Sequence, residues 1–505
     1  MTTITIYDGA NTIGGNKIYL KEGKNGLFLD FGMNFKKYNN YFQEYLTERS
    51  SRGIFDLLHL KLIPKLNIYR KDLITSDIDL STFPSLKIDA VLLSHAHMDH
   101  FGNISLLDES IPVIASPTTI TLLKSIRDSS IASLNNEVAY FTKKIATEDE
   151  RILKSDKAAI YCRQFISTIR FPDTLEDFLT VRFRKKDYVK GELCMLNDFY
   201  TPFQIKAFEV DHSIYGATAF LIQGENTVAY TGDLRLHGKK SNSSKEFIAN
   251  SKEASILIIE GTRAKRKDFN EPEEIVYQNC LKLVEISKGL VIADFTARNF
   301  ERLETFHTIA KKVGRKLVIT SKDAYLLKAI EKVDGINRTK DMLIYKMLKV
   351  KPLSWENYLL KSEADIQLID PLEISKNPED YLLCFSFFDV KNLLDINPTK
   401  GTYIYSSSEA FAEESEFDFI RLNNWLRHFG FEIYGFEIIE KQNRLKPEFV
   451  RGFHASGHLS QSEIRWVIER IDPDIIIPVH TDNPKWFKEN YDNVILLQDG
   501  QSFSK

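Results

Sequence analysis

Four side chains that bind metal ions lie within six consecutive positions, since residues 95–100 read His-Ala-His-Met-Asp-His. Residues 88–93, directly before them, form a short apolar run typical of a β-strand. Imidazole and carboxylate together suit zinc or manganese. Alternate residues face the same way only in extended structure, so a turn at Met98 would divide the ligands between two metal ions. A histidine cluster on a solvated loop is the alternative, and the preceding strand argues against it. The two pairs would be His95 with His97, and Asp99 with His100.

More candidate ligands follow other strand-like runs of the chain. Catalytic groups usually collect at the strand ends of a layered α/β domain, which favours a shared site. Taken singly, an Asp after a strand is more often a turn former, and a lone His is usually a satisfied polar residue. These residues therefore indicate a metal site only when they are taken together. Its members are Asp30 after residues 26–29, His212 after the run that begins at Ile205, Asp233 after residues 227–230, and His480 after residues 475–479.

Composition narrows the class of protein. A chain of 505 residues predicts at least two domains, and 43% apolar residues can fill their cores. The net charge of −3 argues against a globally basic nucleic-acid binder, although a local basic channel remains compatible with it. The four cysteines are widely spaced, which indicates a reducing compartment rather than a disulfide framework. The first residues lack the features of a signal peptide, and no apolar run approaches about 18 residues, so we expect a soluble cytoplasmic protein.

The motifs resemble those of the metallo-β-lactamase superfamily, with residues 95–100 as its signature. Three further segments resemble the β-CASP nuclease branch of that superfamily. Within the branch, the His-x-Ser-x-His form and residues 9–16 are most similar to ribonuclease J. The outlying superfamily motifs are Asp30, His212 and Asp233. The three β-CASP segments are Glu260-Gly261-Thr262, His454-Ala455-Ser456-Gly457-His458 and Pro478-Val479-His480.

The resemblance implies an α/β fold, namely a metallo-β-lactamase αββα sandwich with an inserted α/β β-CASP domain. Strand–helix alternation after Glu260 independently favours a parallel-sheet α/β domain, with a strand at 289–293, a helix at 298–313 and a strand at 316–320. Residues 41–46 and 53–58 look helical. The expected first domain comprises residues 1–264 and 446–505, with helical insertions at about 33–87 and 118–195 that could be lids or scaffold, and the β-CASP domain comprises residues 265–445.

The resemblance also implies two divalent metal ions, zinc or manganese, which would activate water and neutralise a phosphodiester. Asp30 would orient a ligating imidazole from behind. His458 would donate a proton to the leaving oxygen or stabilise the charged phosphate, and Glu260 would hold its other ring nitrogen. His458 could instead be a polar residue at a helix entry. Metal one is assigned to His95, His97 and His212, metal two to Asp99, His100 and His480, and Asp233 would bridge them.

Two groups of residues are candidates to contact the phosphates of a substrate. In ribonuclease J-like enzymes, the loop that here contains His454, Ser456 and His458 is associated with a pocket for a 5′-monophosphate. Arg263, with the basic residues 265–267 behind it, and Arg298 are the best local basic candidates for a substrate channel. The basic run at 265–267 could equally be a solvated surface segment. The residues of the 454–458 loop could equally serve ordinary loop packing.

The leading functional hypothesis is a metal-dependent nuclease that hydrolyses single-stranded RNA, as a 5′→3′ exonuclease, with endonuclease activity left open. A β-CASP nuclease acting on DNA is the alternative, because no motif reports on the 2′-OH. A small-molecule hydrolase of the superfamily is disfavoured by the inserted domain. A non-catalytic scaffold is disfavoured because no metal ligand is lost. No membrane association is expected, and the sequence leaves homo-oligomerisation open.

Overall fold

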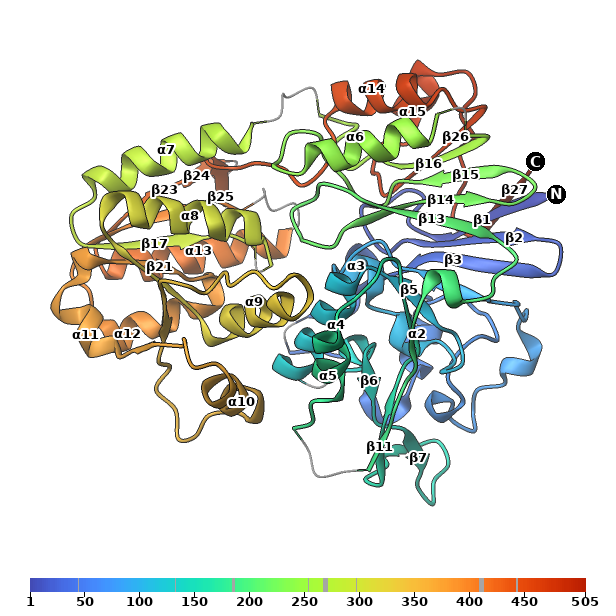
Figure 1. The fold of residues 1–505 in the computed structure, drawn as a ribbon, viewed down its shortest axis with the longest axis horizontal. Helices are drawn as coiled ribbons and strands as arrows, with labels where there is room; N and C mark the ends of the chain where they lie inside the picture. Colours follow the sequence, from blue (N-terminus) through green and yellow to red (C-terminus); the bar gives the residue numbers. More distant parts are fainter. Residues whose placement is uncertain are drawn as a thin grey trace. The chain divides into compact units, whose positions relative to one another are not determined.

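The computed structural model describes residues 1–43, 45–131, 133–183, 187–252, 254–266, 271–296, 298–407, 413–441 and 444–505. The chain divides into two compact units, whose elements are labelled in Figure 1. Unit 1 comprises Met1–Leu236, Lys240–Asp268 and His458–Lys505, and unit 2 comprises His237–Lys239 and Phe269–Gly457. Unit 2 thus continues beyond residue 445, where the inserted domain was expected to end.

Unit 1 is built on two sheets that share one apolar core. Residues of both sheets, such as Ile18, Leu92 and Tyr230, lie together in that core with almost no exposed surface. The eight-stranded sheet has the order β12 (Leu193–Met195), β10 (Phe165–Ser167), β5 (Val113–Ala115), β4 (Ala90–Leu92), β3 (Asn25–Phe31), β2 (Lys17–Glu22), β1 (Thr2–Asp8), β27 (Gln501–Ser504). The five-stranded sheet has the order β13 (Gln204–Glu209), β14 (Thr218–Gln223), β15 (Thr227–Tyr230), β16 (Ile256–Glu260), β26 (Ile475–Val479).

Helices cover the outer faces of this pair of sheets, as the expected αββα sandwich requires. A second core cluster joins strand residues such as Leu257 to Phe247 of helix α6 (Ser241–Asn250) and Val467 of helix α14 (Gln461–Ile471). Helix α14 begins with a capping box, in which Ser460 and Glu463 each bond the other's backbone N–H. On the other side, helix α3 (Met98–Phe101) contacts β3 and helix α4 (Pro117–Ser129) contacts β10.

The expected insertions need correction in part. The described residues between 41 and 46 are not helical: an isolated bridge pairs Gln43 with Leu46. Glu44 lies outside the described residues. Residues 53–58 do contain a helix, α2 (Phe55–His59). The insertion at 118–195 contains helices α4 and α5 (Asp173–Thr180) but also many short strands, so its description as helical holds only in part. Besides β10 and β12, these strands are β6 (Tyr140–Phe141), β7 (Lys144–Ala146), β8 (Leu153–Ser155), β9 (Ala159–Cys162) and β11 (Asp187–Val189).

Unit 2 contains a seven-stranded sheet whose strand pairs are all parallel, which confirms the expected strand–helix alternation. Its order is β20 (Leu368–Ile369), β19 (Met342–Tyr345), β18 (Lys316–Ile319), β21 (Tyr381–Cys384), β17 (Leu290–Asp294), β22 (Gly401–Tyr405), β23 (Phe431–Tyr434). The connecting segments include α8 (Phe300–Val313), α9 (Ser321–Asp334), α10 (Ser354–Ser362), α11 (Pro371–Lys376), η8 (Phe387–Asn392), α12 (Leu393–Ile396) and α13 (Glu413–His428). Helix α7 (Glu273–Ile286) precedes the sheet, and the hairpin β24 (Phe436–Lys441) and β25 (Arg444–Phe449) follows it.

The turn that carries residues 95–100 packs directly on the end of strand β3. The backbone N–H of Met33 donates to the carbonyl of Met98 at 3.1 Å, and that of Gly15 donates to the carbonyl of Asp99 at 3.0 Å. Gly32 lies where these backbones approach: a Cβ added there would stand 1.7 Å from the Asp99 carbonyl oxygen. Only glycine therefore fits between the strand end and the turn.

We expect Gly32→Ala to lower the free energy of unfolding by about 2–3 kcal/mol, because the added methyl group must push two packed backbone segments apart. Urea denaturation measures this change. Gly23→Ala is the matched control, since a Cβ at Gly23 meets nothing within 4 Å and costs only left-handed backbone strain at φ +57°, about 1–2 kcal/mol. A Gly32→Ala protein as stable as the native one would show that the strand end and the turn can separate freely.

Candidate metal centre

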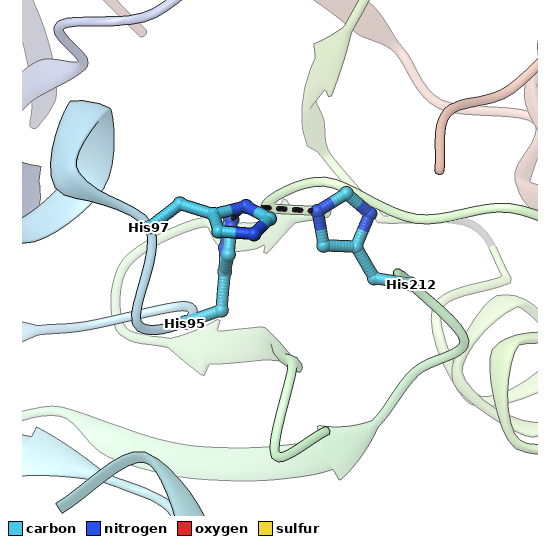
Figure 2. A group of neighbouring side chains, drawn as sticks. All are labelled: His95, His97 and His212. Carbon is cyan, nitrogen blue, oxygen red and sulfur yellow. Dashed lines mark hydrogen bonds between the residues drawn. The ribbon is translucent and has the colours of Figure 1, made fainter. Parts of the chain in front are cut away.

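The imidazoles of His95, His97 and His212, which were assigned to one metal ion from the sequence, lie close together in unit 1. His95 Nε2 lies 2.8 Å from His97 Nδ1, and His212 Nε2 lies 3.2 Å from the same atom. Figure 2 shows the three rings turned toward one another from two separate segments of the chain. His95 and His97 follow β4, whereas His212 lies in the turn between β13 and β14. Ring nitrogens this close suit a shared metal ion.

A second group forms beside the first from Asp99, His100 and His480. His480 Nε2 lies 3.3 Å from His100 Nε2 and 3.2 Å from Asp99 Oδ2. His480 follows β26 and has a φ of 52°, a left-handed conformation that is uncommon for histidine. Its backbone N–H donates to the carbonyl of Gly9 at 2.8 Å, which holds this unusual turn in place.

The carboxylate of Asp233 lies between the two groups. Its Oδ2 is 3.0 Å from His100 Nε2, 3.6 Å from His480 Nε2 and 3.7 Å from His95 Nε2. Its Oδ1 is buried and has no hydrogen-bond partner among the described residues. An unpartnered buried carboxylate oxygen among imidazoles is the donor set of a bridging ligand, so the residues present fit two divalent ions.

Asp30 supports the site from behind rather than facing the convergent nitrogens. Its Oδ2 lies 2.7 Å from His100 Nδ1, and both Ser94 Oγ at 2.7 Å and Tyr230 Oη at 2.6 Å donate to it. The backbone N–H of Ser94 donates to its other oxygen at 2.7 Å. Such contacts fix the orientation of a ligating imidazole. The sequence analysis missed Ser94 and Tyr230, whose only signals are their places before His95 and at the end of β15.

Glu260 and His458 form a second polar group next to Asp233. His458 Nδ1 lies 3.2 Å from Glu260 Oε1 and 3.9 Å from Asp233 Oδ2. The Thr262 hydroxyl lies 3.2 Å from the same His458 nitrogen and 3.0 Å from His480 Nδ1. Glu260 and Thr262 therefore orient His458 from its Nδ1 side. Since Asp233, Glu260, His458 and His480 could together hold an ion, His458 is also a possible ligand by geometry.

The electrostatics of the cluster follow from burial opposed by close charges. Burial, with the neighbouring His100, His97 and His212, holds the pKa of His95 well below its ordinary value, which keeps this imidazole in the form that binds metal. Burial alone would raise the pKa of Asp233, but nearby histidines lower it well below the usual range. Burial would likewise lower the pKa of His458, but the carboxylates of Glu260 and Asp233 raise it to about 9.

A buried ion pair fixes the spacing of two candidate ligands. Arg235 Nε donates to Asp211 Oδ1 at 2.8 Å, and the exposed fractions of the two side chains are 0% and 1%. The backbone N–H of Arg235 also donates to the Asp211 carbonyl at 2.8 Å. Asp211 directly precedes His212, and Arg235 lies two residues after Asp233, so this pair ties both ligand segments together. Sequence reasoning gave neither residue a role.

The candidate phosphate-binding residues are distributed over both units. In unit 2, both ring nitrogens of His454 contact carbonyl oxygens, of Ser407 at 2.6 Å and of Gly435 at 2.7 Å, so a phosphate there would have to displace one of them. The Ser456 carbonyl accepts from His237 at 2.9 Å. Arg298 has a φ of 79° and is partly buried, whereas Arg263, in unit 1, is buried. Lys265 is exposed, and Lys267 lies outside the described residues.

Comparison with known proteins places this geometry in a class. Residues 70–120 match the family model of the metallo-beta-lactamase superfamily. Over its whole length the chain also resembles a solved structure described as a protein of unknown function from Enterococcus faecalis V583, with a TM-score of 0.65, 21% identity and 99% of each chain covered. The chain thus has a metallo-β-lactamase fold, as the motifs predicted.

Relatives found by sequence include ribonuclease J proteins. The chain is 23% identical to that of Mycoplasma genitalium over 403 residues, which cover 78% of this chain and 58% of the relative. It is 22% identical to that of Thermus thermophilus over 437 residues, which cover 83% and 63%. The resemblance to ribonuclease J is therefore confirmed, and the chain spans between 58% and 63% of the length of these relatives.

Asp211→Asn should lower the free energy of unfolding by about 3–5 kcal/mol, because it removes the charge of one partner from a buried ion pair. Urea denaturation of both proteins measures the difference. Glu209→Gln is the matched control, because Glu209 ends β13 and forms an exposed ion pair with Lys240. Loss of that pair should lower the free energy of unfolding by less than about 1 kcal/mol. Equal effects of the two substitutions would mean that the buried pair does not fix the ligand segments.

Proposed function

We propose that the protein is a two-metal-dependent nuclease that hydrolyses the phosphodiesters of single-stranded RNA. The observation that carries the proposal is the convergence of two ligand groups on Asp233, whose buried Oδ1 has no hydrogen-bond partner among the described residues. The names of the ribonuclease J relatives support RNA as the substrate class. None of the helices in the described part of the chain is long and apolar enough to cross a membrane. A cytoplasmic location is part of the proposal, because RNA is the proposed substrate class.

In this proposal each part of the site has one task. His95, His97 and His212 would hold one ion, Asp99, His100 and His480 would hold the other, and Asp233 would contribute to both. Two zinc or manganese ions, when bound, supply an activated water molecule and neutralise the charge of the phosphodiester. Asp30 keeps the ring of His100 in place through its Nδ1 contact.

His458 is the proposed proton donor to the leaving oxygen. Glu260 and Thr262 both approach its Nδ1, so the ring is held from one side in a fixed orientation. Its side chain is 22% exposed, more than that of any other histidine in direct contact with Asp233, so a substrate phosphate could reach it. A general acid needs this combination of orientation and access.

We further propose that cleavage proceeds stepwise from a 5′-monophosphate end. The loop of His454, Ser456 and His458 leads into α14, whose capping box fixes the point at which His458 is presented. Donors in such a loop would bind a terminal phosphate by charge-assisted hydrogen bonds. The carbonyl contacts of His454 must then rearrange when an end binds.

The function is tested with labelled RNAs that carry 5′-monophosphate, 5′-hydroxyl or 5′-triphosphate ends, a circular RNA and matched DNA, each with zinc and with manganese. We expect mononucleotide release to be fastest from the 5′-monophosphate RNA, since only that end offers a charged group of the right size. Cutting of circular RNA at an equal rate would replace the exonuclease by an endonuclease. Hydrolysis of DNA alone would replace the substrate class.

Asp99→Ala controls for contaminating nucleases in this assay. We expect it to lose about one metal equivalent per chain, measured by elemental analysis, together with most activity, because Asp99 lies in the group with His100 and His480. The circular dichroism spectrum should be unchanged, since the side chain of Asp99 is partly exposed. Normal turnover by Asp99→Ala would remove Asp99 from the metal site.

His458→Ala should lower turnover by roughly 10²–10⁴-fold through loss of acid–base help. Bound metal per chain should stay at the level of the native protein, because the proposed ligand sets do not include His458. His458→Gln, which retains a hydrogen-bonding group but cannot donate a proton as an imidazolium does, should be similarly slow. If His458→Ala lost a full metal equivalent, His458 would be a metal ligand and not the proton donor.

A further inference from the structure

Unit 2 contains a cavity of about 410 Å³ at the carboxyl end of its parallel sheet. The lining includes residues at or just past the ends of four strands: Phe295 after β17, Thr320 after β18, Tyr345 at the end of β19 and Ser386 after β21. Its volume lies in the range of pockets that bind small molecules. The metal centre of unit 1 contributes none of its lining residues.

The cavity lies at a switch point in the order of the strands. β18 and β21 are neighbours in the sheet, but the chain leaves β18 through α9 toward β19 and leaves β21 through η8 and α12 toward β22. β19 and β22 lie in opposite directions along the sheet from this pair, so the two connections diverge. In open parallel sheets, the crevice between such diverging connections is the usual place for a ligand.

Two buried hydrogen-bond donors in the cavity lining have no partner. The indole Nε1 of Trp355 and the amide Nδ2 of Asn392 make no hydrogen bond to the described residues, although the side chains are only 6% and 4% exposed. Buried donors are nearly always satisfied in folded proteins, and an unsatisfied one calls for an external acceptor. The two donors therefore indicate a ligand with acceptor atoms.

The cavity lining has three carboxylates, of Asp323, Glu356 and Asp389, against two lysines, Lys322 and Lys349, so its charge does not favour an anionic ligand. Asp323 accepts from the backbone N–H of Thr320 and Asp389 from that of Ser386, at the beginnings of α9 and η8. Glu356 accepts from the backbone N–H of Leu353 at the beginning of α10. Each element thus has its own carboxylate where a phosphate would otherwise bind. Lys349 forms an ion pair with Glu356, so it is not available to a phosphate without breaking that pair.

The lining is also rich in aromatic rings. Phe295, Tyr345 and Trp355 contribute to the wall, and the side chain of Phe388 is 81% exposed. The exposed face of the Phe388 ring is open to a flat group that stacks on it. Stacking on such a ring suits any nucleobase, since every base has a π face.

We propose that this cavity binds an uncharged nucleobase, supplied either as a free nucleoside or as one base of an RNA chain. Trp355 and Asn392 donate to ring acceptors of the base, and an exocyclic amino group donates to Asp389 or Asp323. The base stacks on Phe388. This site is independent of the proposed nuclease activity, since it needs neither the metal ions nor the residues of unit 1.

Isothermal titration calorimetry of the full chain with adenosine, guanosine, cytidine and uridine tests the site. We expect saturable binding of at least one nucleoside, and weaker binding of the matching 5′-monophosphate because of the carboxylates. Trp355→Phe should weaken binding about fivefold by removing one donor. Phe388→Ala should weaken it by about fivefold or more, without loss of stability, because this ring is mostly exposed. A short RNA oligonucleotide in competition with the nucleoside distinguishes the two sources of the base.

Leu394→Ala is the control variant, since Leu394 is an exposed apolar residue of α12 that does not line the cavity. It should bind the nucleoside like the native protein. The proposal is overturned if no nucleoside binds at millimolar concentration, or if Trp355→Phe and Phe388→Ala bind as tightly as Leu394→Ala. Tighter binding of the monophosphate, or of spermidine as a cationic probe, would replace the uncharged base by a charged ligand.

Discussion

The carboxylate of Asp30 is the contact on which the arrangement of unit 1 depends. It accepts hydrogen bonds from Ser94, which follows β4 in the larger sheet, and from Tyr230, which ends β15 in the smaller one. The same oxygen approaches the ring of His100. A fully buried carboxylate is tolerated only when its hydrogen bonds are satisfied, so the ends of both sheets must meet at this point. The ligand turns then have little freedom to separate.

Sequence patterns predicted the candidate ligands that lie close together in the chain. They did not predict residues whose role depends on a contact with a distant part of the chain. Closely spaced histidines and carboxylates after strand-like runs are visible in one short window, as at residues 95–100. Tyr230 and Arg235 are not visible in such a window, because each supports the site through a residue outside it. Tyr230 donates to Asp30, and Arg235 donates to Asp211. The confirmed part of the fold, the alternating strands and helices of unit 2, likewise rests on short periodic patterns.

The wrong expectation at residues 41–46 has a comparable cause. The spacing of aromatic residues there suits one face of a helix, but Phe42 is buried while Tyr45 is 86% exposed. The tertiary structure buries the ring of Phe42, and an isolated bridge pairs Gln43 with Leu46. Intrinsic helix preference is a small energy and yields to such packing. In the insertion at 118–195, strands β10 and β11 pair with segments more than about 25 residues away in the chain, which lie outside a local window.

Because unit 2 is inserted in the sequence of unit 1, the last part of unit 1 is synthesised after unit 2. Strand β26, with His480 after it, is made only after all of unit 2, yet it pairs with β16 along its whole length. Until then β16 is an edge strand with unpaired backbone groups. The nascent chain already has His95, His97, His212 and Asp233, but not His480 or His458. A chain whose synthesis stops inside unit 2 therefore lacks His458 and His480 of the candidate centre.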